Sequence, residues 1–466
     1  MDGFGDAFGI AFGGGTATSN PTTIIASPGA PNLAIDVQPS VIEGTFSLDV
    51  SELDSEDLLG WGSGEWVNVV CDVSAVRARR GATEMQGVLT RAEAGELVVE
   101  LVDSERRFDP MVNADALHAG TPIRLRAWGE DNDGASWSAT LFTGELDDVP
   151  VSYVKTGPPV VSLVASDRIA ELARWAAEGR PEPGVGAGEG LRSRVYRVLD
   201  EVGLTSSTVS ADSDTGFAAD LAPTKLTAGW DDITEAVDAE LGRVWVDASN
   251  RLVIRSRGSE LSGPVRGTFS DWHGEANAEP HCCYDDITAT LGTAGLVNRA
   301  IGQRRAVGDG DEPVVSSRDD AWSIAMHRQR GVERRDLALF DDAEVREWTG
   351  YLLVAMSRPK LRVDRISPAP WTADASAWRA VCSTDLGDRW ETRYHPEVGP
   401  TVRQTLGVLG IEHEITPEGW SITFSTMGAP TPGDANPSGY LALEVSTLDG
   451  PDVLAPYGGT WGVPAA

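Results

Sequence analysis

The clearest alternation of apolar and polar side chains lies within residues 401–427. Residues 411–415 alternate isoleucine and His413 with glutamate, and residues 420–424 alternate large apolar side chains with serine and threonine. Because successive side chains of a strand point to opposite faces, both stretches predict strands with one buried face. Thr416-Pro417-Glu418-Gly419 between them suits a tight turn. The pattern predicts a β-hairpin in which His413 is a core residue rather than a metal ligand.

Other stretches with the same period predict further strands. Residues 389–394 alternate strictly and add a third strand to the hairpin. Nearer the N-terminus, short strands are predicted at residues 66–70, 97–101, 123–128 and 138–146, and Asn132-Asp133-Gly134 supplies turn residues between the last two. These N-terminal strands fit a small barrel or sandwich.

Apolar residues at helical spacing predict four helices. The first is capped by Ser166 or Asp167 and ends before Arg180-Pro181-Glu182-Pro183, the second covers residues 191–202, and the third runs from Asp231 to Leu241. A tight hairpin follows, with Ala248-Ser249-Asn250 joining residues 243–247 to 251–255. The last helix begins with a capping box of Asp341 and Glu344, buries Val345, Trp348 and Leu352, and stops at Ser357-Arg358-Pro359.

The predicted elements divide the chain into regions. At 466 residues it is long enough for about three domains of roughly 150 residues each, and 51 glycines and 27 prolines favour many turns. We predict a mainly β fold in which two β-barrel-like domains flank a small helical α+β domain, with extended N- and C-terminal arms. The expected parts are a Gly-rich N-terminal assembly arm with Phe4, Phe8 and Phe12 (1–33), a first β-barrel-like domain (34–166), an α+β insert (167–260), a second β-barrel-like domain with one helix (261–430) and a Pro- and Gly-rich C-terminal arm (431–466).

The charge of the chain narrows the function classes. Lysine and arginine number 38 against 71 acidic residues, a formal charge of −33. Nucleic-acid affinity depends on neutralising phosphates, so this balance argues against a DNA-binding role. Four cysteines, two of them adjacent, make a poor disulfide framework and favour a reducing compartment. The chain does not begin with the pattern of a leader peptide, and no run approaches the ~20 apolar residues of a membrane span. We therefore expect the newly made chain to be soluble and cytosolic.

No set of side chains has the spacing of a catalytic, cofactor or metal site, and the sequence predicts none. Adjacent carboxylates at residues 147–148, 231–232, 285–286, 319–320 and 341–342 are expected by chance among 71 acids, and Asp231 and Asp341 are explained as helix caps. In His281-Cys282-Cys283 the neighbouring thiols of a strand point to opposite faces, so buried small apolar residues are predicted rather than zinc ligands.

Two acidic loops and the tryptophans leave alternatives open. Asp131-Asn132-Asp133-Gly134 and Asp309-Gly310-Asp311 have oxygen ligands for calcium, but neither continues to the glutamate of an EF-hand, and turn chemistry explains both. No nucleophile elbow, zinc-protease or phosphate-loop motif occurs. The 15 tryptophans are spread along the chain, which favours core packing over sugar stacking.

Two ordered sets of short motifs remain. The C-terminal set is Leu386-Gly387-Asp388-Arg389, then Gly410 to Pro417, then Trp420. The N-terminal set is Arg80-Gly81, Ala94-Gly95, residues 97–101, Arg107-Phe108-Asp109-Pro110, residues 120–126 and Leu141-Phe142-Thr143-Gly144, with Asp103 where asparagine is more usual. Both sets resemble the tail-hub family, the minor tail proteins at the tail tip of tailed phages of actinobacteria, and with their surroundings they cover roughly half the chain.

The resemblance implies a structural virion protein and not an enzyme. It implies a siphophage tail-tip or baseplate hub that closes the tail tube, connects it to receptor-binding parts and lets DNA pass. The acidic charge is consistent with either of two roles, a channel lining that repels DNA or the solubility of a large assembly. The implied assembly is a homotrimer, made in the host cytoplasm, that presents six similar modules to a hexameric tail-tube or distal tail protein. The tape-measure protein and receptor-binding or other minor tail proteins are further implied partners, without sequence-specific nucleic-acid binding.

Two alternatives to the tail hub stay open. One is a secreted or lysis-released acidic glycan-binding module or glycoside hydrolase. The other is the adjacent hexameric distal tail protein, which would share the strand-rich composition.

Overall fold

The computed structural model describes residues in all the predicted regions except the C-terminal arm. The described residues are 31–38, 40–41, 62–63, 66–69, 72–82, 91–112, 117–131, 133–176, 185–204, 209–211, 219–224, 226–257, 263–271, 280–293, 295–307, 310–369, 375–398 and 401–428. Phe4, Phe8 and Phe12 of the predicted N-terminal arm, and the whole of the predicted C-terminal arm, lie outside them. Strand β1 (Asn32–Val37) already begins within the predicted arm of residues 1–33.

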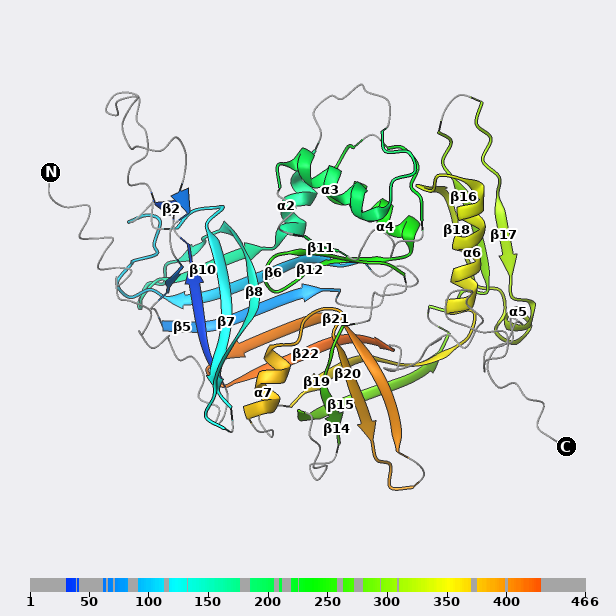
Figure 1. The fold of residues 1–466 in the computed structure, drawn as a ribbon. Coiled ribbons are helices and arrows are strands. Elements are labelled where there is room, and N and C mark those ends of the chain that lie inside the picture. The colour runs from blue at the N-terminus through cyan, green and yellow to red at the C-terminus, as the bar shows by residue number, and fades with distance from the viewer. Residues whose placement is uncertain are drawn as a thin grey trace, which may run out of the picture.

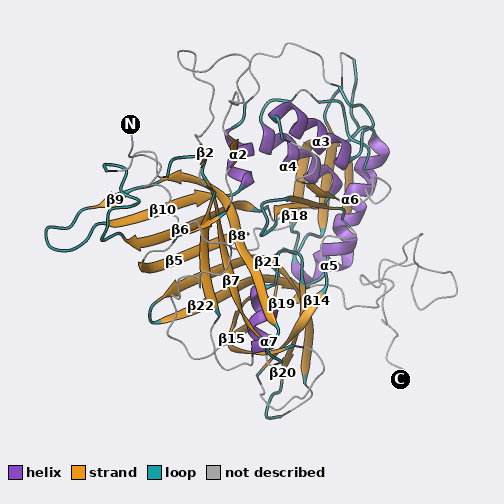
Figure 2. Ribbon diagram, turned by 60° about the vertical axis from the view of Figure 1, so that its left-hand side comes forward, coloured by secondary structure: helices purple, strands orange, loops and turns teal. Residues whose placement is uncertain are grey.

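The fold is mainly β, as predicted, and the largest sheet formed by the described residues holds 14 strands. Six of these strands, all within residues 261–430, close into a barrel (Figures 1 and 2). In order they are β20 (Arg389–Tyr394), β14 (Val265–Ser270), β15 (His281–Gly292), β19 (Lys360–Pro368), β22 (Gly419–Gly428) and β21 (Val402–Thr416), and β21 pairs again with β20. Phe269 and Trp390 stack inside the barrel with ring centroids 4.1 Å apart.

The first β region continues the same sheet beyond the barrel. Strand β21 also pairs with β5 (Asp72–Gly81), and the order runs on through β6 (Glu93–Val102), β10 (Val160–Ser166), β8 (Ser136–Asp148), β7 (Pro122–Glu130), β1 and β4 (Val67–Asn68). Strand β9 (Val151–Ser152) pairs with β10, and β2 (Ser40–Val41) pairs with β3 (Gly62–Ser63) in a separate sheet. One hydrophobic core extends through both β regions, from Leu33 to Phe424.

Both hairpins predicted in the β regions are present. Strands β21 and β22 are joined by a two-residue turn, with Thr416 opposite Gly419, and His413 faces the core as the alternation predicts. Between β7 and β8, Gly134 has φ 76°, a left-handed conformation that glycine adopts without strain. The carboxylate of Asp131 accepts hydrogen bonds from backbone N–H groups of that turn at 2.9 and 3.2 Å.

The predicted α+β insert has its helices and its hairpin. The elements are α2 (Arg168–Arg174), α3 (Leu191–Val202), β11 (Val209–Ala211), α4 (Gly229–Glu240), β12 (Arg243–Val246) and β13 (Leu252–Arg255), with β13 between β11 and β12 in a small sheet. Asp167 caps α2 by accepting a hydrogen bond from the backbone N–H of Ile169 at 2.9 Å. Ser166, the other predicted cap, is instead the last residue of β10.

The cap of α4 differs from the prediction. The helix begins after Ala228, so Asp231 lies in its first turn instead of at its N-cap. The neighbouring Asp232 reaches back and accepts hydrogen bonds from the backbone N–H groups of Thr227 and Ala228, at 2.7 and 2.9 Å. As in a capping box, a carboxylate near the start of the helix accepts hydrogen bonds from N–H groups ahead of it.

Residues 261–430 hold three helices among those described, where the sequence predicted one. The elements are β16 (Arg299–Arg304), β17 (Ser316–Asp319), α5 (Ala321–His327), β18 (Gly331–Leu337), α6 (Asp342–Met356) and α7 (Ala375–Cys382). Only α6 was predicted, and its cap Asp341 and buried residues Val345, Trp348 and Leu352 are confirmed. The helices α5 and α7 have 7 and 8 residues, too short for helical periodicity to show in the sequence.

A second hydrophobic core joins α6 and the sheet β17–β16–β18 to the insert. Ala300, Leu337 and Trp348 belong to the same cluster as the buried residues of α2, α3 and α4. The indole Nε1 of Trp348 donates a hydrogen bond to the backbone oxygen of Asp238 on α4 at 3.0 Å. One continuous core therefore spans the boundary predicted between residues 260 and 261. Among the described residues, no helix combines the length and apolarity needed to cross a membrane.

Candidate functional site

The adjacent carboxylates bind arginines and backbone N–H groups wherever the structure gives their contacts. Asp147 lies 2.6 Å from Arg174, Asp319 lies 3.6 Å from Arg299 and Asp342 lies 3.1 Å from Arg304. Asp320 caps α5 by accepting from Ser323 N at 2.9 Å, and Asp341 caps α6. The side chain of Asp286 lies outside the described part. These contacts are those of helix caps and surface ion pairs.

The two acidic loops are also occupied by contacts within the chain. Arg379 of α7 lies 3.2 Å from Asp131, whose other oxygen holds the β7–β8 turn. Arg304 donates to Asp311 at 2.7 Å, and this hydrogen bond lowers the pKa of Asp311 to about 2. Asn132 and Asp309 lie outside the described residues. Within the described ranges, no group of three or more histidine, cysteine or acidic side chains is placed to hold a metal.

Of the soft ligands considered from the sequence, Cys282, Cys283 and His413 are buried, and His281 is partly buried. Cys282 and Cys283 on β15 and Cys382 on α7 have buried side chains. His413 is buried beneath Trp420, whose Nε1 donates to His413 Nδ1 at 3.3 Å. Burial, reinforced by the charge of Arg80, lowers the pKa of His413 to about 3, so the imidazole is neutral at physiological pH.

The two motif sets of the sequence meet at one joint. Arg80 of β5 is buried, and its guanidinium lies 2.6 Å from Oδ1 of Asp385, just before β20. The other oxygen of Asp385 accepts from the backbone N–H of Ala248, in the β12–β13 turn, at 3.1 Å. A single carboxylate therefore links the first β region, the barrel and the α+β insert. Its partners are far apart in sequence, so no local pattern predicts the contact.

The glycine beside this joint is required by close packing. Gly81 has φ 80°, and a Cβ there would lie 2.2 Å from the backbone oxygen of Leu409 and 2.9 Å from the Leu386 side chain. Asp388 accepts hydrogen bonds from Arg266 at 2.6 Å and from the backbone N–H of Asp385 at 2.8 Å. Arg80 and Gly81 of the N-terminal motif set and Leu386 of the C-terminal set thus lie at the contact between the two β regions.

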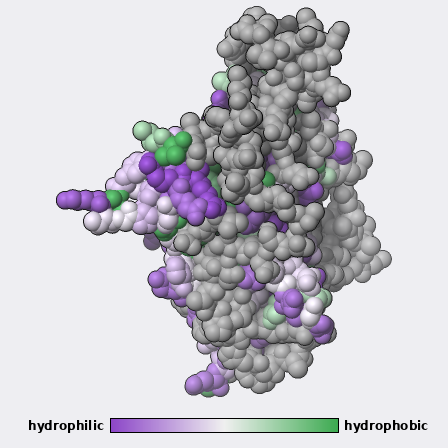
Figure 3. Space-filling model, turned by 90° about the vertical axis from the view of Figure 1, so that its left-hand side faces the viewer, coloured by the Kyte–Doolittle hydropathy of each residue, from purple (hydrophilic) through white to green (hydrophobic). Residues whose placement is uncertain are grey.

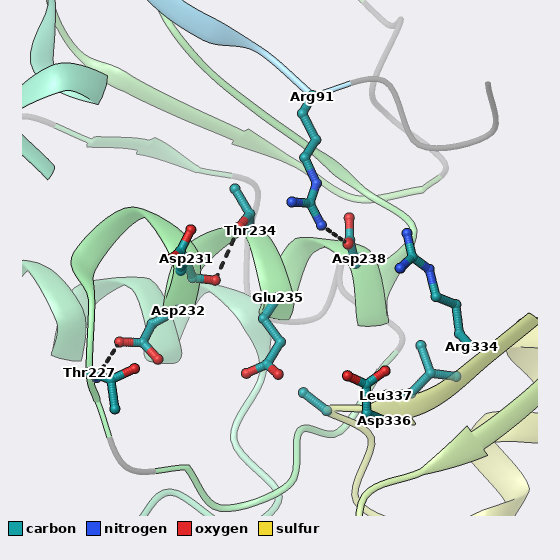
Figure 4. A pocket seen from close by; sticks show the side chains of 11 residues that line it. Arg91, Thr227, Asp231, Asp232, Thr234, Glu235, Asp238, Arg334, Asp336 and Leu337 are labelled. Atoms are coloured by element: carbon teal, nitrogen blue, oxygen red, sulfur yellow. Dashed lines mark hydrogen bonds and ion pairs between the residues drawn. The ribbon is translucent and has the colours of Figure 1, made fainter. Parts of the chain in front are cut away.

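A polar pocket of about 310 Å³ lies between α4 and β18, below Arg91, which precedes β6 (Figure 4). Arg91 forms an ion pair with Asp238, while Asp232 holds the backbone ahead of α4. Glu235 forms an ion pair with Arg305. Burial raises the pKa of Asp238, against the opposing effect of Arg91. Arginines or backbone N–H groups bind these carboxylates. The pocket is therefore a charged contact region between packed elements of the chain. The sequence did not predict this pocket, because the residues that line it are far apart in the chain.

Comparisons with known proteins give weak structural similarities. No family model matches the chain, and no curated protein matches it in sequence. Among solved structures, the chain is similar to a 43 kDa tail protein of prophage MuSo2 from Shewanella oneidensis, with 10% identity, a TM-score of 0.49, and coverage of 84% of this chain and 98% of that one. It is similar to a tail protein from Neisseria meningitidis, with 11% identity, a TM-score of 0.49, and coverage of 85% and 96%.

A third similarity is to an Escherichia coli component of the type VI secretion system, described as similar to bacteriophage T4 tail proteins. The identity is 9%, the TM-score 0.42, and the coverage 77% of this chain and 74% of that one. At these identities and TM-scores the likenesses carry no argument about activity or partners.

Proposed function

We propose that this chain is a structural protein of a phage tail tip, a hub that closes the tail tube and connects it to receptor-binding parts. The observation that carries the proposal is the joint between Arg80 and Asp385. Arg80-Gly81 and Leu386-Gly387-Asp388-Arg389 belong to the two motif sets that resemble the tail-hub family, and they are in contact although their positions in the chain are far apart. Motifs that meet at the contact of two β regions fit an architectural role.

The proposed assembly is a homotrimer in the virion. Its partners would be a hexameric tail-tube or distal tail protein, the tape-measure protein and receptor-binding proteins of a siphophage of actinobacteria. The formal charge of −33 per chain suits a channel past which DNA slides without adhering. Acidic walls repel phosphates within a Debye length of ~8 Å at physiological salt.

The tryptophans weigh against the glycan-binding alternative. Trp137, Trp348, Trp378, Trp390 and Trp420 are buried, and no tryptophan is among the exposed large apolar residues of the described part. Stacking on a sugar needs an exposed aromatic face, which these indoles do not offer.

The molar mass of the purified chain tests the proposal. A hub should associate to three times the mass of one chain, and the associated form should bind the tail-tube or distal tail protein. A hexamer would instead favour the distal tail protein. A monomer that binds oligosaccharides would favour the glycan-binding alternative and overturn the hub.

A further inference from the structure

One surface of this acidic chain is both apolar and basic, and is here called the α5 surface. It is formed by α5, by the loop Arg328-Gln329-Arg330 that follows α5, and by the C-terminal end of α6. Met326 of α5 is 62% exposed on it. The guanidinium of Arg358, just after α6, lies 4.7 Å from the centre of the Trp322 ring, so α5 packs on the end of α6.

The charge of the α5 surface is opposite to that of the chain as a whole. Residues 321–332 and 348–359, which form it, contain three arginines and no acidic residue. Arg328 and Arg330 are exposed. Within the described part of the chain, neither guanidinium has an ion-pair or hydrogen-bond partner. The α5 surface is therefore a local concentration of positive charge on a chain whose formal charge is −33.

The acids that flank the α5 surface are bound by other groups. Asp319 lies 3.6 Å from Arg299, and Glu333 forms an ion pair with Arg335. The carboxylate of Asp320 caps α5. The two arginines of the loop are therefore available to an acidic partner.

The loop that carries these arginines is held in a strained conformation. Arg328 has φ 62° and ψ 165°, a backbone conformation that glycine adopts far more readily than other residues. The buried Asn298 fixes the loop, since its Nδ2 donates to the backbone oxygen of Arg328 at 2.8 Å and its Oδ1 accepts from the backbone N–H of Arg330 at 2.6 Å. Strained residues that are held in this way cluster at ligand-binding sites. An arginine where glycine would fit without strain indicates that its side chain is used.

The C-terminal arm, residues 431–466, has a complementary composition. It contains four acidic residues and no lysine, arginine or histidine. The segment 440–452 combines three of these acids, Glu444, Asp449 and Asp452, with large apolar side chains. The apolar residues are Tyr440, Leu441, Leu443, Val445 and Leu448. A segment of this kind matches a surface that is apolar and basic.

The chain leaves the barrel close to the α5 surface. Strand β22 ends at Gly428 and pairs with β19. The hydroxyl of Thr426 donates to the backbone oxygen of Val363 at 2.6 Å, so the end of β22 lies beside the start of β19, which follows Arg358 and the end of α6. In Figure 1, β22 runs toward the side of the barrel on which α5 and α6 lie. The 11 residues 429–439 extend over at most ~40 Å, which places the segment 440–452 within reach of this side.

The opposite end of the molecule also exposes apolar side chains, but its charges differ. Figure 3, which faces this end, shows apolar surface beside strongly hydrophilic surface. Met111 is 79% exposed there. Of the neighbouring arginines, Arg106 forms an ion pair with Asp109 and Arg107 with Glu105. Because both arginines already have acidic partners, the α5 surface is the better match for an acidic segment.

We propose that residues 440–452 of the C-terminal arm bind the α5 surface of the same chain, with Glu444 and Asp449 facing Arg328 and Arg330. Apolar side chains form the centre of the contact, and the opposite charges fix its orientation. The contact lies within one chain, so this inference goes beyond the proposed function and does not depend on it.

Hydrogen exchange of the full-length chain tests the contact. We expect the backbone amides of residues 440–452 to exchange about tenfold or more slowly than those of a synthetic peptide with the same sequence. The double variant R328E/R330E should remove most of this protection, because like charges then face one another. The double variant E444R/D449R should do the same, and combining all four substitutions should restore the protection.

A matched control and a check on the fold accompany these variants. The double variant R346E/R403E reverses two other exposed arginines and should leave the protection of residues 440–452 unchanged. Thermal unfolding of each variant shows whether the fold is intact.

Each outcome decides for or against the contact. Loss of protection in both double variants and its recovery in the combined one would support it. Exchange of residues 440–452 as fast as in the free peptide, or protection that both double variants retain, would overturn it. Protection that falls when the protein is diluted would assign the segment to another copy, and would overturn a contact within one chain. The position of the chain in assembled tails tests the proposed function separately.

Discussion

The guanidinium of Arg80 lies 2.6 Å from the carboxylate of Asp385, a residue 305 positions further along the chain. The arginine side chain is 3% exposed and the aspartate 29%. Since Asp385 also accepts from the backbone N–H of Ala248, this pair joins the first β region to the barrel and to the α+β insert. A rigid joint between these parts is what a protein must have if its two β regions are to take fixed places in a larger assembly.

Removing the carboxylate from this joint should destabilise the fold. Asp385→Ala leaves the charge of Arg80 buried without its partner, and breaking a buried ion pair in this way costs about 3–5 kcal/mol. Because Asp385 is partly exposed, we expect the lower end of that range in denaturant unfolding. Asp364→Ala is the matched control, since its ion pair with Arg362 is at 3.6 Å and its side chain is 49% exposed. Equal losses in the two variants would contradict a structural joint.

The barrel hairpin gives a second stability prediction. Trp420 is 7% exposed and packs on Trp378 with ring centroids 5.1 Å apart. Trp420→Ala should lower the free energy of unfolding by ~3–5 kcal/mol because it leaves a cavity in the core. Ser421→Ala, on the exposed face of the same strand, should change it by less than ~0.5 kcal/mol. A loss below ~1 kcal/mol for Trp420→Ala would show that the indole does not support the core.

His413 predicts how stability depends on pH. Its pKa is lowered from an ordinary 6.5 to about 3, so below pH 6.5 the unfolded chain binds a proton that the folded chain excludes. Stability from this residue is therefore fully present above pH 6.5 and is lost as the pH falls toward 3, by about 1.4 kcal/mol per pH unit in that window.

His413→Gln keeps an acceptor for the Trp420 N–H but does not titrate in this range. The difference in unfolding free energy between the wild type and this variant should shrink as the pH is lowered from 7 to 4. Burial raises the pKa of Asp167 to about 6, which makes its own contribution fall as pH rises through the window from 3.8 to 6. Asp167 is present in both proteins, so its contribution cancels in the difference. A difference that does not vary with pH would mean that His413 takes up its proton equally in the folded and the unfolded state.

Sequence periodicity predicted the local elements of the fold well and its long-range contacts poorly. The bounds predicted for α3, residues 191–202, agree with the structure, and the β21–β22 hairpin has the predicted turn and buried face. These elements depend on local spacing and turn residues. The Arg80–Asp385 pair and the Arg91–Asp238 pocket depend on which strands pair, and no local pattern encodes that. The short helix α7 is stabilised by Trp378 and Val381 in the barrel core rather than by its own periodicity.

The N-terminal arm gives a prediction about assembly. Phe4, Phe8 and Phe12 stand in a segment whose glycine content disfavours an independent fold. Deleting residues 1–30 should therefore leave the unfolding transition of the isolated chain unchanged but impair its incorporation into tails. The comparison requires tails assembled with the full-length and the shortened chain in parallel. Normal incorporation of the shortened chain would show that the arm has no part in assembly.

The most direct test of the central claim is the position of this chain in an assembled phage tail. A peptide label inserted at Gly134, in the exposed β7–β8 turn where a side chain would meet no neighbouring atom, can be located by electron microscopy with a bound antibody fragment. The tail-hub proposal predicts three labels around the axis at the tip of the tail, below the last ring of the tube. Labels distributed along the tube, or a virion that lacks the chain, would contradict it.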